Sequence, residues 1–334
     1  MSLVKLDRST SSSSTQPMHR MKAMLLARSA AGKTSLTTAI RHTAVYKRQP
    51  SRLVFSPGNP LLTNSLREDV SAKTSDMQSG GLNSTLKQET HRLTLVNGPR
   101  AICDLDICDT VGQLTTLTGT ASTDDLKRCE AFMSDLASAQ VIVVAVPVLP
   151  PDPTSEQRER FGDDITITNS WLFQALSRRG DSPTAIAIVP TKLDIRHQGA
   201  EAAREECQGE AFLEEIRPLL ETIEAFPSAC NECAVIPCSA YGLGNSIPVK
   251  AAALGGKPAA ASEPEYMLAT SSLQPFGVQT LLTYITLAGL LNQTPHGDAE
   301  QPLSKAALLL SSDLAAPSLQ SQSIVIPICG RIYG

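Results

Sequence analysis

The chain has 334 residues, 42% of them hydrophobic, which is enough to bury the core of one large domain or two ordinary ones. Its 29 basic residues against 33 acidic ones give a formal net charge of −4, so no overall attraction to nucleic acid or to anionic membranes is expected. The apolar runs at 141–149 and 281–291 are shorter than the roughly 20 residues that span a bilayer, and no membrane anchor is expected.

Residues 1–20 are rich in Ser and Thr and lack apolar periodicity, which predicts a flexible leader. The next segment, MKAMLLARSAAG, has the basic start and the small residues of a signal peptide. Arg28 interrupts its short apolar part, so a secretory signal is not favoured.

Beyond the leader, apolar strand-like runs alternate with helical patterns, which is typical of a parallel sheet covered by helices. The expected strands lie at 22–27, 91–96, 101–108, 141–148, 184–190 and 234–238. The expected helices lie at about 36–44, 122–139, 165–178, 201–225 and 278–291. The predicted fold class is therefore α/β, with a doubly wound, mostly parallel six-stranded sheet and helices on both faces.

The first strand runs into ARSAAGKT at 27–34, which matches the phosphate-loop consensus G-x-x-x-x-G-K-[ST] except that Ala27 replaces the leading Gly. Such a loop needs backbone N–H groups around the phosphates, a helix N-terminus, a Lys for the terminal phosphates and a hydroxyl for magnesium. An ordinary strand-to-helix turn is the alternative. The expected phosphate-binding residues are Ser29, Ala30, Ala31, Gly32, Lys33, Thr34 and Ser35, of which Thr34 would also contact the metal.

Two segments exceed the needs of such a domain. Residues 48–88 are long, polar and rich in Ser, Thr, Asn, Gly and Pro, which predicts a functional loop with little secondary structure of its own. Residues 244–272, rich in Ala, Pro and Gly, form a second predicted insertion. We therefore expect one domain at 21–292 with these two insertions, and a tail at 293–334.

The strand at 101–108 ends in LDICDTVGQ at 105–113, which resembles the LDxxDTxGQ run of the Ras-like small GTPases, a branch of the P-loop GTPase superfamily. The resemblance implies that Asp109 holds Mg²⁺ and that the Gly112 N–H approaches the γ-phosphate. It also implies that Gln113 orients the attacking water. Taken alone, Asp109 has a plainer interpretation as a helix cap.

Two later runs extend the resemblance. Thr191-Lys192-Leu193-Asp194 resembles the family's [NT]-K-x-D motif. Guanine presents adjacent N1–H and N2–H₂ donors that one carboxylate accepts together, so Asp194 would recognise the base while the stem of Lys192 lies along its ring. The run CSA resembles the family's last motif, in which the Ala240 N–H meets guanine O6 beside Ser239. Each run alone also fits a polar turn or a strand end; all occur in order at predicted strand ends, where ligands bind in α/β sheets.

The distance from Gly32 to Asp109, 77 positions (109 − 32), exceeds that of a minimal small GTPase. The resemblance places a magnesium-binding Thr in the first switch, just before the second strand. Thr85 is the candidate, with Ser84 and Thr90 as substitutes and an ordinary loop residue as the alternative. The sequence identifies no activating arginine: surface solvation is the better interpretation of Arg28, Arg67 and Arg92.

The resemblance implies a guanine-nucleotide-binding protein that takes GTP or GDP with Mg²⁺ and hydrolyses GTP as a switch. Gln113 and Lys33 would be its catalytic residues, and turnover would be slow without an activating or effector protein. The alternative is a nucleotide-binding scaffold with little or no turnover. Retention of Lys33, Thr34, Asp109 and Gln113 favours the switch, whereas Ala27, Ser29 and the extended first switch favour caution. An ATP-dependent enzyme would require TKLD and CSA to be coincidental.

The tail holds a helical pattern at 303–314 and the run SIVIPICG, which could add an edge strand or stay mobile. Several cysteines lie in apolar surroundings, as is typical of a reducing, cytoplasmic compartment. Cys230 and Cys233 are a close pair with Cys238 as a possible third metal ligand, but no second pair at zinc spacing is evident.

Overall fold

The computed structural model describes residues 19–28, 31–46, 53–56, 60–79, 89–97, 100–109, 123–180, 182–248, 266–270, 273–293, 301–316 and 325–329. The strands of its main sheet are β1 (His19–Leu26), β2 (Leu53–Ser56), β3 (Glu89–Asn97), β4 (Arg100–Asp109), β5 (Val141–Pro147), β6 (Thr184–Thr191), β7 (Cys230–Val235) and β10 (Ile326–Cys329). The helices are α1 (Lys33–Tyr46), α2 (Pro60–Ser79), α3 (Thr123–Ser138), α4 (Ser155–Ser177), α5 (Ala200–Gln208), α6 (Glu210–Glu215), α7 (Arg217–Ala225), α8 (Val278–Gln293) and α9 (Gln301–Leu314).

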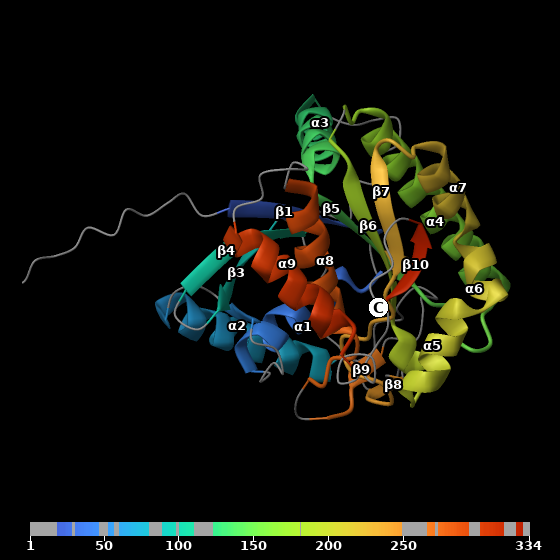
Figure 1. Cartoon of the computed structure of the whole chain (residues 1–334). Coiled ribbons are helices and arrows are strands. Elements are labelled where there is room, and N and C mark those ends of the chain that lie inside the picture. Colours follow the sequence, from blue (N-terminus) through green and yellow to red (C-terminus); the bar gives the residue numbers. More distant parts are fainter. Residues whose placement is uncertain are drawn as a thin grey trace, which may run out of the picture.

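The sheet has the order β10-β7-β6-β5-β1-β4-β3-β2, with β1 near its centre (Figure 1). Strands β4, β1, β5, β6 and β7 are parallel, whereas β2 and β3 at one side and β10 at the other run antiparallel to their neighbours. The predicted mostly parallel α/β sheet is confirmed. The expected number of strands, six, is wrong, because β2 and β10 extend the sheet to eight.

Side chains alternate across the sheet and bury both of its faces. On β1, Ala23 and Leu25 belong to a core shared with α1, α8 and α9. Met24 and Leu26 point the other way, into a core shared with α3, α4 and the helices α5 to α7. Figure 1 shows α8 and α9 on one face and α3 and α4 on the other. The prediction of helices on both faces is therefore confirmed.

The prediction of a loop with little secondary structure at 48–88 is wrong, because this segment contains β2 and the 20-residue helix α2. Phe55 of β2 is buried, as are Val70 and Met77 of α2. Val70 and Met77 lie seven residues apart, so they share one face of the helix. Most other side chains of α2 are polar, and so sparse an apolar stripe gives little periodic signal in the sequence.

Two helix boundaries also differ from the expectation. The helix expected at 201–225 is three helices, separated at Gly209 and at Ile216, where Pro218 lies in the first turn of the last one. Helix α4 begins about three turns earlier than expected. Thr154 caps it: the Thr154 hydroxyl accepts from the Gln157 N–H, and the Gln157 side chain accepts from the Thr154 N–H.

The tail contributes to the same fold. The helix predicted at 303–314 is present as α9, which packs on α8, and the last apolar run forms the edge strand β10 beside β7. Among the described residues, no helix is long and apolar enough to cross a membrane. All eight cysteines are described and are free thiols. In that part of the chain, no three His, Cys, Asp or Glu side chains are placed to hold a metal ion together.

Candidate functional site

The predicted phosphate loop joins β1 to α1. Ala27 is buried in the core on the α1 face, so its methyl group is accommodated where the consensus has Gly. Gly32 has φ +82°, a left-handed backbone conformation that residues other than glycine rarely adopt. Its carbonyl accepts a hydrogen bond from the Leu36 N–H at 2.8 Å. The loop thus turns at Gly32 and begins the helix at Lys33. Ser29 and Ala30 lie outside the described residues.

Two buried charges meet at this turn. Lys33 is the first residue of α1 and is 6% exposed, and Asp109 is the last residue of β4 and is 1% exposed. The Lys33 Nζ lies 4.0 Å from the Asp109 Oδ1. Burial lowers the pKa of Lys33 from 10.5 to about 8, and the charge of Asp109 opposes the shift. Burying charged groups is costly, so such a pair at a helix N-terminus marks a candidate binding site.

The oxygen atoms beside the start of α1 are of the kind that bind a magnesium ion. Register pairs Asp109 with Leu25, so the carboxylate lies beside the strand end that leads into the phosphate loop. Thr34 brings a hydroxyl in the first turn of α1. Carboxylate and hydroxyl oxygens are ligands that Mg²⁺ takes in nucleotide sites, so these residues fit the ion. The other predicted members, Thr85, Gly112 and Gln113, lie outside the described residues.

Thr191 ties the end of β6 to the phosphate loop. Its hydroxyl donates to the carbonyl of Ala31 at 2.7 Å, and the carbonyl of Val146 on β5 lies 3.3 Å away as a second acceptor. A Cβ built on Gly32 would touch the Thr191 side chain at 3.6 Å. The structure therefore brings the predicted phosphate-binding and base-binding segments into direct contact.

After Thr191 the chain turns sharply at Lys192, the single residue other than glycine with positive φ (62°) in the described chain. This turn leads into a short 3₁₀ helix, η2 (Leu193–Ile195), that carries Asp194. The Ser239 hydroxyl donates to the Asp194 Oδ1 at 2.5 Å, and the Ser246 hydroxyl donates to its Oδ2. Burial raises the pKa of Asp194, while these two hydrogen bonds and the charge of Lys192 oppose the rise.

The segment after β7 completes this side of the site. Ser239 pairs through its backbone with Phe276, and its hydroxyl accepts the Gly242 N–H at 3.0 Å. Ala240 is partly buried against the core on the α1 face. Burial raises the pKa of the Tyr241 phenol to about 12, and the neighbouring Ser35, in the first turn of α1, opposes the rise. The predicted residues Ser239 and Ala240 are thus held beside both Asp194 and the start of α1.

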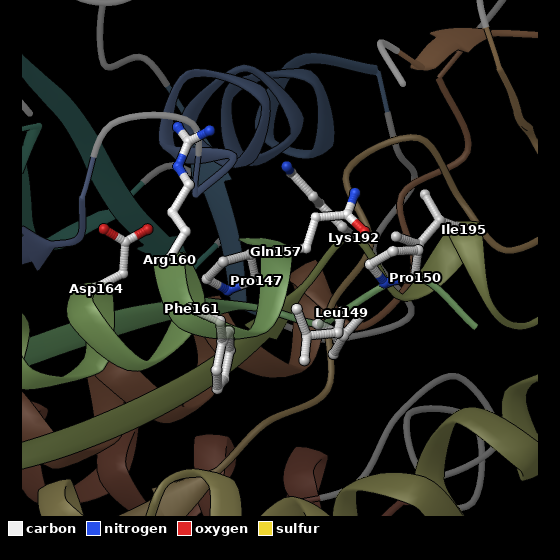
Figure 2. A pocket seen from close by; sticks show the side chains of 10 residues that line it. Pro147, Leu149, Pro150, Gln157, Arg160, Phe161, Asp164, Lys192 and Ile195 are labelled. Carbon is white, nitrogen blue, oxygen red and sulfur yellow. The ribbon is translucent and has the colours of Figure 1, made fainter. Parts of the chain in front are cut away.

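A cavity of about 50 Å³ lies beside Lys192, between residues 147–150 at the end of β5 and the first turns of α4 (Figure 2). Gln157, Arg160 and Asp164 line its α4 side, and Figure 2 shows the labelled side chains of Gln157 and Lys192 on neighbouring sides. Ligand pockets for small molecules are several times larger. This cavity is therefore too small to be the nucleotide site itself.

Sequence reasoning missed three contributors. Ser246 belongs to a segment that was expected to be an insertion, and Tyr241 follows the CSA run without belonging to it. The interpretation of Arg28 as a solvated surface residue is wrong: it forms an ion pair with Asp164 of α4 at 2.8 Å, and both side chains are 16% exposed. The pair anchors the phosphate loop to that helix. The partners of Ser246 and Arg28 lie 52 and 136 positions away along the chain, so no local pattern could indicate these contacts.

No protein-family model matches the chain, and no curated protein matches it. The chain is similar to the Ski7 GTPase-like domain of S. cerevisiae, whose crystal structure is bound to GTP. The identity is 13% and the TM-score 0.42, over 90% of this chain and 51% of that one. The chain thus spans about half the length of the structure it matches.

Proposed function

We propose that this protein binds guanine nucleotides and hydrolyses GTP to GDP and phosphate as a switch of the Ras-like small-GTPase type. The observation that carries the proposal is the hydrogen bond between the Thr191 hydroxyl and the Ala31 carbonyl. It joins a loop suited to phosphates and a strand end suited to guanine at one edge of the sheet, where α/β folds bind ligands.

At the phosphate end, the backbone N–H groups of residues 29–35 and the N-terminus of α1 would surround the β- and γ-phosphates. Phosphate charge would replace the water that burial has removed from Lys33 and favour its ammonium form. Thr34 and Asp109 would hold Mg²⁺, with Thr85 added in the GTP state. The ion, when bound, neutralises charge that develops on the phosphate oxygens.

At the base end, Asp194 would accept the N1–H and N2–H₂ donors of guanine with its two oxygens. The Lys192 stem would lie along the ring, and the Ala240 N–H would meet O6. Adenine presents an acceptor at N1 and no amino group at C2, so it would leave the carboxylate without these donors. Selectivity for guanine would follow from that mismatch.

For hydrolysis, Gln113 would orient the attacking water and the Gly112 N–H would meet the γ-phosphate. We expect slow GTP hydrolysis without a protein partner. Arg28, the arginine of the phosphate loop, is paired with Asp164 of α4 and so would not stabilise charge on the γ-phosphate. That contact also favours a second function, a nucleotide-binding scaffold with little turnover. A cytoplasmic location is part of the proposal, supported by eight free thiols, six of them buried.

Phosphate release from MgGTP under single-turnover conditions tests hydrolysis, with GDP titrated in parallel to show that each variant still binds. We expect Gln113→Ala to abolish release while GDP affinity is retained, and Lys33→Ala to weaken both. A wild-type protein that binds GTP and releases no phosphate above the uncatalysed rate would select the scaffold. Release that Gln113→Ala leaves unchanged would show that another group positions the water.

A further inference from the structure

The hairpin of β8 (Ser246–Pro248) and β9 (Tyr266–Leu268) stands apart from the main sheet and next to the base-binding segment (Figure 1). Ser246, its first residue, donates a hydrogen bond to the Asp194 Oδ2. Ser239 donates to the other oxygen, Oδ1, from the segment that follows β7. Two separate parts of the chain therefore hold one carboxylate.

We infer that Ser246 is a positioning residue for base recognition, which acts by fixing the plane of the Asp194 carboxylate. This inference rests on the proposed function. A carboxylate held at one oxygen can pivot about that hydrogen bond, whereas one held at both oxygens keeps one orientation. Each oxygen accepts about two hydrogen bonds, so the two serines leave an acceptor site on each oxygen for a base. A guanine-type base, with two adjacent N–H donors, would use both.

The hairpin is itself held in place, which makes Ser246 part of a supported arrangement. Ser246 pairs with Leu268 across the hairpin, and the Ala269 N–H donates to the Asn245 carbonyl at 2.8 Å. Leu268 is buried against Met77 of α2. A second contact with α2 is the Gln78 side chain, which donates to the Thr270 carbonyl at 2.9 Å. Helix α2 therefore supports, through the hairpin, the residue that orients Asp194.

Loss of the Ser246 hydroxyl has a second consequence. Burial raises the pKa of Asp194, and hydroxyl donors oppose this because they stabilise the ionised form. The charged group that acts on Asp194 is Lys192, which favours ionisation. The Tyr241 phenol nearby has its own pKa raised to about 12 by burial and by the charge of Asp194. Without Ser246 the pKa of Asp194 rises further. A protonated carboxyl cannot accept both donors, so nucleotide binding would fail at a higher pH than in the wild type.

The test is calorimetric titration of MgGDP and MgIDP from pH 5 to 8 into wild type, Ser246→Ala, Ser246→Thr and Asp194→Asn. Inosine diphosphate lacks the N2 amino group, so it offers the carboxylate only one donor. For Ser246→Ala we expect GDP affinity to fall about tenfold, the size of one hydrogen bond to a charged group. IDP affinity should fall less, the pH at which GDP binding is half lost should rise, and Ser246→Thr should restore both. Ser177→Ala, which removes an exposed helix hydroxyl on α4, is the matched control.

The variants also separate a positioning role from a structural one. Asp194→Asn, which removes the carboxylate that Ser246 orients, should lose GDP binding and so marks the largest loss that Ser246→Ala could cause. The inference would be overturned if Ser246→Ala had the same GDP affinity, the same ratio of GDP to IDP affinity and the same pH dependence as the wild type. The proposed function would then stay intact. Equal losses of GDP and IDP affinity with an unchanged pH dependence would also overturn the inference. A folded wild-type protein that does not bind GDP would overturn both.

Discussion

The Thr191 hydroxyl donates a 2.7 Å hydrogen bond to the carbonyl of Ala31, across 160 positions of sequence. Thr191 is 5% exposed and Ala31 is 2% exposed, so water cannot replace this bond easily. The loop proposed to hold phosphates and the strand end proposed to hold the base are thereby fastened to each other. A substitution in either segment should therefore alter the position of the other segment.

Thr191→Val tests this fastening, because it keeps the branched shape and removes the donor. The Ala31 carbonyl loses this buried partner, so the variant should be about 1–3 kcal/mol less stable and should bind GDP more weakly. Urea unfolding and GDP titration measure the two effects. Thr191→Ser, which keeps the hydroxyl, should behave nearly as wild type. Equal stability and affinity in Thr191→Val would refute the fastening.

Gly242 should be irreplaceable. Its φ is +90°, and a Cβ there would lie 2.2 Å from the carbonyl oxygen of Gln274, so backbone would have to move. Gly242→Ala should therefore lower the melting temperature markedly and disturb Ser239, which accepts the Gly242 N–H. Gly162→Ala is the matched control: nothing lies within 4 Å of that Cβ, and Ala in helix α4 should stabilise by up to about 1 kcal/mol. Similar melting temperatures for both variants would contradict this account.

The ion pair of Arg28 and Asp164 should couple the phosphate loop to α4. Both side chains are largely buried and their charged atoms lie 2.8 Å apart. In a double-mutant cycle with Arg28→Ala and Asp164→Ala, we expect a coupling free energy of about 0.5–3 kcal/mol in chemical unfolding. Additive single-variant effects would mean that the pair does not anchor the loop.

Cys329 should be the most reactive thiol near neutral pH. The Cys230 thiol, its hydrogen-bonding neighbour on β7, lowers the pKa of Cys329 to about 7, whereas burial raises the pKa of Cys238 well above its usual value. Because the thiolate is the nucleophile, the rate of iodoacetamide modification should rise with pH to a midpoint near 7. Peptide mass mapping after short exposure measures it. Cys230→Ala should move the midpoint upward; modification of Cys238 before Cys329 would contradict the assignment.

The sequence predicts the chemistry at the strand ends better than it predicts their surroundings. Gly32, Lys33, Asp109 and Asp194 lie in short runs whose order follows the strands, so local pattern locates them, and the structure brings them to one edge. The residues of α2 carry a sparse apolar stripe, and its burial depends on α1 and on the β8–β9 hairpin. Ser246 has no local signal at all, because its partner lies 52 positions away. Such contacts come from tertiary packing, which single-segment patterns do not encode.

The most direct test of the central claim is calorimetric titration of MgGDP, MgADP and magnesium xanthosine diphosphate into wild type and Asp194→Asn. The account predicts that wild type binds GDP at least a hundredfold more tightly than ADP, since a site built for paired donors rejects a base that lacks them. The side-chain amide introduced by Asp194→Asn would present one donor group and one acceptor, which matches xanthine, with its oxygen at C2, in place of guanine. Asp194→Asn should therefore lose GDP and gain xanthosine diphosphate. Equal binding of GDP and ADP by wild type, or unchanged GDP binding by Asp194→Asn, would contradict the claim.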